Sequence, residues 1–130
     1  MEKWEPGSHG GTYGGNAVAC AAAVATIQSI REEALLDNTR ERGTQMFTGL
    51  RHLQEVYPEF SDLRGLGLMI GIELSVAAAP IVEMCMVRGF FINAVQENTI
   101  RLIPPLIIGR ASVDAFVDCL FEIFEEMEKG

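Results

Sequence analysis

Hydrophobic positions in the first half of the chain follow the spacing of two α-helices. Asn16 is a favourable N-cap, and residues 17–31 are a near-continuous run of strong helix formers. The apolar face of this segment carries mostly alanine, which suits close packing against another helix or a sheet. A polar junction follows, and a second amphipathic helix is predicted to run to about Tyr57, where Pro58 ends it.

In the second half the hydrophobic period changes to that of strands. Strands are predicted at residues 68–74, 90–94 and 99–103, with a helix at 77–88 and a final amphipathic helix beginning near Ser112. Residues 64–67 are interpreted as a tight turn leading into the first strand. Gly89 suits the left-handed position that ends a helix.

This order of elements predicts an α+β fold, in which helices pack on a small, mainly antiparallel, three-stranded sheet. We expect one domain with three parts: a glycine-rich loop at residues 1–15, two helices at 16–57 and an α/β core at 58–130. The alanine-rich helix has too little bulk to form a core by itself. It is therefore expected to pack against a surface outside this chain, such as a partner subunit.

Composition excludes several classes of protein. Hydrophobic residues make up 48% of the chain and charged residues 22%, as in folded globular domains. No apolar run approaches the roughly 18 residues of a membrane span. The net charge is −8 and the only lysines are Lys3 and Lys129, so a nucleic-acid partner is not expected.

The three cysteines do not suggest a metal site. Cys20, Cys85 and Cys119 are far apart, form no CxxC pair, and have only His9 and His52 as possible co-ligands. Each cysteine lies in an apolar helical pattern, which favours a reduced thiol in the core. A reducing, cytoplasmic location is expected.

The segment of residues 7–17, GSHGGTYGGNA, is the part of the chain richest in candidate chemistry. Glycines permit sharp turns, and a helix N-terminus supplies unpaired N–H donors and the positive end of its dipole. The combination favours a phosphate cradle in which the Thr12 hydroxyl donates a hydrogen bond. Two alternatives stay open: a loop that serves only as a turn, and a cloning remnant, because Gly-Ser-His is common in such sequences.

Arg101 is the second candidate. It lies in the predicted strand at residues 99–103, where a permanent cation among apolar neighbours is costly unless a carboxylate faces it. A structural ion pair with an acidic helix of the same domain is one explanation. Recognition of a carboxylate from outside the domain is the other.

Three segments, in this order, resemble the C-terminal part of class III (omega-amino acid) aminotransferases: GSHGGTYGGNAVACAAAVATI, DLRGLGLMIGIEL and TIRLIPPLII. These are fold-type I enzymes that use pyridoxal 5′-phosphate, and they include 4-aminobutyrate, ornithine and acetylornithine aminotransferases. The glycine motif ending in GGNAVA is most similar to the 4-aminobutyrate branch. The resemblance covers the whole chain but only the last third of such an enzyme.

The resemblance implies site roles for a few positions. Thr12 matches the threonine that binds the cofactor phosphate across the dimer interface, and Gly11 stands where many members have serine, so only its backbone contributes. Arg101 matches the arginine of an R-x-x-P-P motif, which handles a substrate carboxylate or pairs with a gating glutamate of the large domain. His9 either touches the phosphate or caps the turn, and Tyr13 is expected at the subunit interface.

A further motif, RGxG at residues 64–67, also matches the family. Its members Arg64, Gly65 and Gly67 are interpreted as structural, because glycines beside a strand serve backbone geometry.

In the family the Schiff-base lysine and the groups that hold the cofactor ring lie upstream, in a larger domain. Lys3 is too close to the glycine motif to be that lysine, and Lys129 lies in the C-terminal tail. The leading hypothesis is therefore the C-terminal portion of an aminotransferase that moves an amino group from an omega-amino acid to 2-oxoglutarate. It would not be catalytic alone, and its partners would be the large domain and a second subunit.

Two further hypotheses come from other functional classes. One is a freestanding module that binds a phosphate-bearing ligand. The other is a dimerisation module that binds no ligand.

Overall fold

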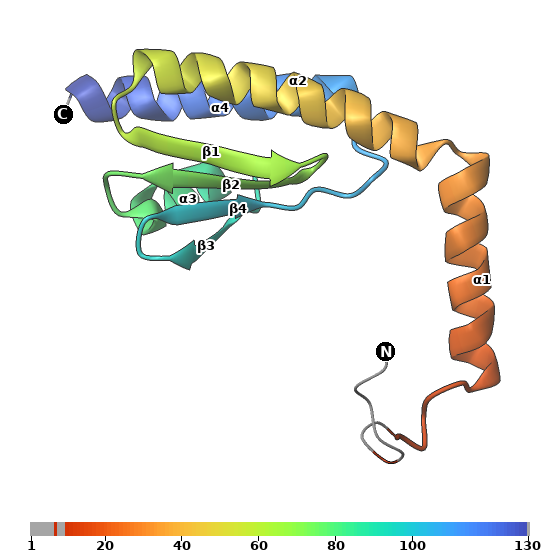
Figure 1. The fold of residues 1–130 in the computed structure, drawn as a ribbon. Helices are drawn as coiled ribbons and strands as arrows, with labels where there is room; N and C mark the ends of the chain where they lie inside the picture. Colours follow the sequence, from red (N-terminus) through yellow and green to blue (C-terminus); the bar gives the residue numbers. More distant parts are fainter. Residues whose placement is uncertain (1–6, 8–9, 130) are drawn as a thin grey trace. The chain divides into compact units, whose positions relative to one another are not determined.

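A computed structural model describes residues 7 and 10–129 of the chain. These residues form α1 (Ala17–Glu32), α2 (Leu35–Val56), β1 (Phe60–Leu66), β2 (Met69–Leu74), α3 (Ala78–Val87), β3 (Asn93–Gln96), β4 (Thr99–Leu102) and α4 (Arg110–Lys129) (Figure 1). They belong to two compact units, Met1–Leu35 and Leu36–Gly130. No helix in the described part is both long and apolar enough to cross a membrane.

The predicted α+β class is confirmed, but the sheet in the described residues has four strands rather than three. All neighbouring strands are antiparallel, in the order β1-β2-β4-β3. The strand missing from the prediction is β1. Its pairing with β2 is irregular between Phe60 and Asp62, and it ends in Arg64-Gly65-Leu66. The bulge breaks the apolar–polar alternation, so this segment looks like a turn in sequence.

The boundaries of β3 also differ from the prediction. The strand expected at residues 90–94 lies at Asn93–Gln96. Gly89, with φ +87°, turns the chain out of α3 as predicted, and the Phe90 N–H then donates to the Cys85 carbonyl. Phe90 and Ile92 pack against the core before strand pairing begins. Their hydrophobicity therefore reflects packing against the core and not membership of a β-strand.

The first unit contains α1 and the loop before it. Asn16 caps α1 as predicted, since its Oδ1 accepts from the Ala19 N–H at 2.9 Å. No residue of α1 is buried, and Val18 and Ile27 are more than half exposed. Cys20 is exposed, so its prediction as a core thiol was wrong. Alanine-rich spacing alone does not reveal whether a helix face is covered.

The second unit holds the hydrophobic core, which lies on one face of the sheet. Side chains of β2 alternate, so that Ile70, Ile72 and Leu74 are buried while Met69 is exposed. Ile100 and Leu102 continue this buried face on β4. Helices α2, α3 and α4 supply the other half of the core, which includes Met46, Leu50, Leu53, Ile81, Cys85, Val113, Leu120, Ile123 and Phe124. The opposite face of the sheet is left open by the described residues.

Helices α2 and α4 lie side by side over the sheet (Figure 1). They meet along their length, since a Cβ on Gly49 would lie 2.7 Å from Val117 Cγ1, and the rings of His52 and Phe121 are 5.3 Å apart. Because Gly49 has no side chain, Val117 packs directly on the α2 backbone. The two helices therefore form one closely packed layer over the sheet.

Helix α2 also touches the turn between β1 and β2. Gly43 is buried in the helix, and a Cβ there would lie 2.5 Å from the Gly67 carbonyl oxygen. Gly67 itself has φ +58°, and a Cβ on it would lie 2.8 Å from Thr39 Cγ2. The absence of a side chain at Gly43 lets the helix backbone contact the Gly67 backbone, and the absence of one at Gly67 leaves room for Thr39. The structural role predicted for the RGxG motif agrees with this geometry.

Replacing Gly43 with alanine should destabilise the second unit. An interior helical Gly→Ala change normally stabilises by roughly 0.5–1 kcal/mol. Here the new methyl meets fixed backbone, so we expect a net loss of about 1–3 kcal/mol in the free energy of unfolding by urea. Thr44→Ala, at the exposed neighbouring position, is the matched control and should be neutral or stabilising. A stabilised Gly43→Ala protein would show that α2 does not press on this turn.

The cysteines should differ in reactivity. Burial raises the pKa of the Cys85 thiol to about 12 and also raises that of Cys119. At pH 8, iodoacetamide should alkylate the exposed Cys20 and leave the other two intact until urea unfolds the protein, which peptide mass spectrometry would detect. Because both pKa values are raised in the fold, stability should fall as pH rises above about 9. Equal labelling of all three native thiols would contradict this packing.

Candidate functional site

The glycine-rich loop forms an ordered turn at the N-terminus of α1. The Gly14 N–H donates to the Gly11 carbonyl at 3.3 Å, which places Thr12 and Tyr13 at the tip of the turn. Asn16 ties this turn to the helix, because its Nδ2 donates to the Tyr13 carbonyl at 2.7 Å while its Oδ1 caps the helix. The tip is therefore held next to the end of α1 that carries free N–H groups.

Thr12 is exposed on this turn, and its hydroxyl makes no hydrogen bond within the described residues. A Cβ on Gly11 would meet nothing within 4 Å, so the backbone there is open to a ligand. One free hydroxyl beside a helix N-terminus is a donor set suited to a phosphate oxygen. His9, the other candidate in this loop, lies outside the described residues. Tyr13 is 87% exposed.

Within the described residues, Lys129 is the only lysine. Its Nζ lies 2.6 Å from Glu125 Oε1, and the hydrogen bond to this carboxylate raises the pKa of the lysine. A nucleophilic amine requires a lowered pKa. Lys129 is therefore the cation of a surface ion pair.

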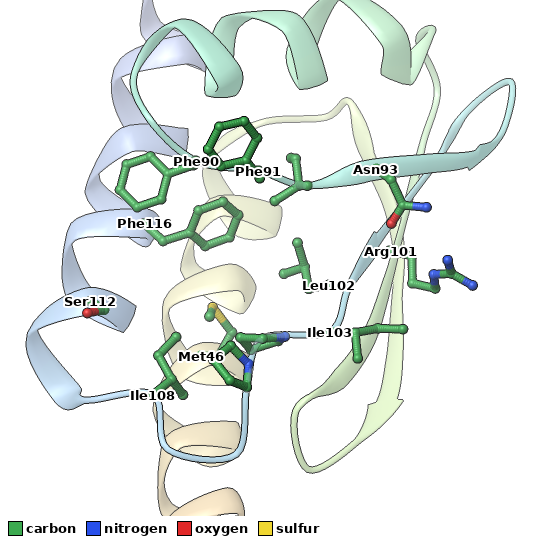
Figure 2. Close-up of a pocket in the computed structure, with 13 residues that line it drawn as sticks. Met46, Phe90, Phe91, Asn93, Arg101, Leu102, Ile103, Ile108, Ser112 and Phe116 are labelled. Atoms are coloured by element: carbon green, nitrogen blue, oxygen red, sulfur yellow. The ribbon is translucent and has the colours of Figure 1, made fainter.

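Arg101 lies on β4 in the second unit, at the rim of a pocket of about 470 Å³ (Figure 2). The pocket opens where β4 ends, between the start of β3 and the helices α2 and α4. Its lining is mainly apolar and includes Met46, Phe90, Leu102, Pro104 and Phe116, with Asn93, Arg101 and Ser112 as the polar members. Figure 2 shows the side chains of Asn93 and Arg101 next to each other and pointing away from the apolar lining. The Arg101 guanidinium therefore lies on the open face of the sheet, whereas the cavity itself is lined by apolar side chains of the core.

The loop after β4 is fixed by α2. Asn38 Nδ2 donates to the carbonyl oxygens of Leu106 and Ile108, at 2.7 and 3.1 Å. This asparagine is half-buried near the start of α2, so it holds the chain that follows the two prolines against the helix. The rim of the pocket is thereby built on the same helix that packs on the sheet.

On the open face of the sheet, the two arginines differ in their partners. Arg64 Nη1 lies 2.8 Å from Asp62 Oδ2 and 2.7 Å from Glu73 Oε2, and these hydrogen bonds raise the pKa of its guanidinium. Arg101 forms no ion pair within residues 7 and 10–129. The structural ion pair considered for Arg101 is therefore absent from the described residues, and its charge remains available.

A second hollow, of about 560 Å³, lies on this open face between Arg64 and Arg101. Thr99 lines it. Although Thr99 is only 4% exposed, its Oγ1 has no hydrogen-bond partner in the described part of the chain. A buried hydroxyl without a partner is uncommon and leaves one donor and two acceptor sites unused.

Sequence reasoning missed Asn93 and Thr99. Both are short polar residues on strands whose predicted pattern was apolar, and nothing in their spacing marks them. The usable signal would have been the cross-strand register, which places Asn93 opposite Arg101. The predicted strands at 90–94 and 99–103 contain both residues, but strand boundaries alone do not fix the register between them.

The chain is similar to known proteins in both sequence and fold. The sequence pattern of one family, described as Aminotransferase class-III, matches residues 1–124. The chain belongs to this family. Its members use pyridoxal phosphate.

Two curated members illustrate the similarity. Acetylornithine aminotransferase from Methanocaldococcus jannaschii is 41% identical over 95% of the chain, and ornithine aminotransferase 1 from Staphylococcus saprophyticus is 38% identical over 97%. The chain spans 31% and 32% of their lengths, or about a third of each. Class-III membership over this region agrees with the resemblance seen in the sequence.

Solved aminotransferase structures share the fold. Acetylornithine aminotransferase from Elizabethkingia anophelis superimposes with a TM-score of 0.86 and 27% identity, covering 95% of this chain and 33% of that one. Ornithine aminotransferase from Plasmodium falciparum gives a TM-score of 0.87 and 27% identity, covering 100% and 34%. The fold is that of the C-terminal region of these enzymes.

The branch expected from the sequence was wrong. The GGNAVA ending suggested 4-aminobutyrate aminotransferases, but the named relatives are acetylornithine and ornithine aminotransferases. A single glycine-rich motif at a helix N-terminus reports a local backbone geometry. It therefore carries little information about the amino donor.

Loss of the Arg101 guanidinium should affect stability little. The side chain is exposed and has no carboxylate partner in the described residues, so Arg101→Ala should change the melting temperature by less than about 3 °C. Arg88→Ala is the comparison variant. It removes a half-buried guanidinium that binds Glu126 and the Met84 carbonyl, and should lower the melting temperature more. An equal loss in both variants, measured by circular dichroism, would make Arg101 structural.

Proposed function

We propose that this chain is the C-terminal portion of an aminotransferase that transfers an amino group from ornithine or acetylornithine to 2-oxoglutarate with pyridoxal phosphate. The observation that carries the proposal is the exposed Arg101 guanidinium, which has no ion pair in the described residues and borders the hollow on the open face of the sheet. A guanidinium fork matches a carboxylate in shape and charge. Both the amino donor and 2-oxoglutarate present carboxylates.

The proposed role of Thr12 and Gly11 is to bind the cofactor phosphate. Support comes from the turn that presents the Thr12 hydroxyl beside the N-terminus of α1, and from the open backbone at Gly11. When bound, the cofactor supplies the electron-withdrawing ring that makes amino-group transfer possible. The residues described here fit its phosphate end. The described residues provide no free lysine for its aldehyde end, because Lys129 is engaged by Glu125.

Activity therefore requires the remaining two thirds of a class-III enzyme, which would supply the lysine that binds the cofactor. We further propose a second subunit against α1. Support comes from this helix itself: none of its residues is buried, and Val18, Val24 and Ile27 are each more than half exposed. Apolar side chains exposed along one helix are typical of a surface that meets another chain.

A hybrid enzyme tests the proposal. In it, this chain replaces the matching third of the Methanocaldococcus jannaschii acetylornithine aminotransferase, and glutamate formation is followed with acetylornithine or ornithine and 2-oxoglutarate. Turnover is expected, and Arg101→Lys should raise KM for 2-oxoglutarate by about tenfold or more, because the bidentate contact is lost. A folded hybrid that binds cofactor but shows no turnover, or an Arg101→Lys hybrid with unchanged kinetics, would contradict the proposal.

The phosphate contact is tested separately with Thr12→Val, which removes the hydroxyl and keeps the shape. In the hybrid, the Kd for pyridoxal phosphate should rise about threefold to thirtyfold, because one hydrogen bond to a charged group is lost. Thr26→Val is the matched control. Its hydroxyl donates only to the Ala22 carbonyl within α1, so cofactor affinity should not change. Equal affinities for the Thr12 variant and its parent, measured by fluorescence titration, would remove Thr12 from the cofactor site.

A further inference from the structure

Four residues form one row across the open face of the sheet. Strand register pairs Arg64 with Gly71, Gly71 with Arg101, and Arg101 with Asn93, so the row crosses all four strands. The row carries two arginines, and these two positive charges have different surroundings. Arg64 is held by two carboxylates, whereas the neighbour of Arg101 on the outer strand is an amide.

The Asn93 amide engages both the side chain and the backbone of Arg101. In the amide orientation that satisfies both groups, Nδ2 donates to the Arg101 carbonyl at 3.2 Å and Oδ1 accepts from Arg101 Nη2 at 3.1 Å. Figure 2 shows the two side chains next to each other and pointing away from the apolar lining of the pocket. The contact ties the free end of a long side chain to a strand that is itself paired with β4.

An amide and a carboxylate at this position have different consequences. A carboxylate would orient the guanidinium but would also neutralise it, as Asp62 and Glu73 do for Arg64. An amide orients it through one N–H and leaves the remaining donors and the full charge available. Holding the side chain in advance also reduces the conformational entropy lost when a ligand binds.

We infer that Asn93 is a positioning residue, which holds the Arg101 guanidinium for a carboxylate ligand without neutralising its charge. The inference deepens the proposed function and rests on it for the identity of the ligand. The contact between the Asn93 amide and Arg101, which acts as a clamp on the guanidinium, depends only on groups within this chain. It can therefore be tested with no ligand present.

The first test measures the mobility of the guanidinium in the isolated 130-residue chain. The {1H}-15N NOE of Arg101 Nε should be clearly higher than that of Arg51, an exposed arginine on α2, and should fall to the Arg51 value in Asn93→Ala. Gln96→Ala is the matched control, because it is exposed on the same strand and pairs with Thr99. It should leave the NOE unchanged. A low NOE for Arg101 in the wild-type chain would overturn the clamp.

The second test measures carboxylate binding with glutarate as the probe, followed by the Arg101 Nε–Hε signal. Asn93→Ala should weaken binding by about threefold to tenfold, the value of one hydrogen bond. Asn93→Asp should weaken it further, because the new carboxylate competes for the same guanidinium. Equal affinity in the wild type and in both variants would overturn the inference.

The two tests separate this inference from the proposed function. If glutarate fails to bind the wild-type chain while Asn93→Ala still frees the Arg101 side chain, the carboxylate site is wrong and the clamp is supported. If glutarate binds to Arg101 with the same affinity when Asn93 is absent, the carboxylate site is supported and the clamp is overturned. In the hybrid enzyme, a positioning role predicts that Asn93→Ala raises KM for 2-oxoglutarate more than it lowers kcat.

Discussion

The second unit depends on the close approach between the backbone of α2 and the turn joining β1 to β2. Gly43 lets the backbone of the helix lie directly on the Gly67 backbone, and Gly67 leaves room for the Thr39 side chain beside this contact. The same helix carries Asn38, which holds the loop after β4 at Leu106 and Ile108. Helix α2 thus positions both the turn joining β1 to β2 and the loop after β4 at the rim of the pocket. A shift of this helix would displace both.

The two faces of the sheet have separate functions in this arrangement. The buried face carries the aliphatic side chains of β2 and β4, which pack beneath the helices that supply most of the core. The open face carries the charges. Because residues alternate along a strand, Arg101 can be exposed while Ile100 and Leu102 on either side of it are buried. A stable core and a charged site are therefore built from the same four residues of β4.

Long periodic segments were predictable from sequence, and the failures elsewhere have physical causes. The helix periods and the strand at β4 agree with the prediction within a few residues, and Thr12 and Arg101 stand out by residue type and neighbours alone. β1 was missed because a bulge and a glycine break its alternation. β3 was displaced because Phe90 and Ile92 are hydrophobic for packing that precedes the strand. The pairing of Asn93 with Arg101 depends on register, which an incorrect strand boundary cannot supply.

The charge distribution around Arg101 determines how a ligand would be recognised. The chain has a net charge of −8, and the nearby pair Asp62 and Glu73 outweighs Arg64 by one negative charge. At distances beyond the Debye length of about 8 Å, an approaching dianion meets no attractive field from this chain. Attraction acts only within that distance, where the oriented guanidinium is near the carboxylate. Selectivity at such a site follows the shape of the anion rather than its total charge, and the encounter rate gains little from low ionic strength.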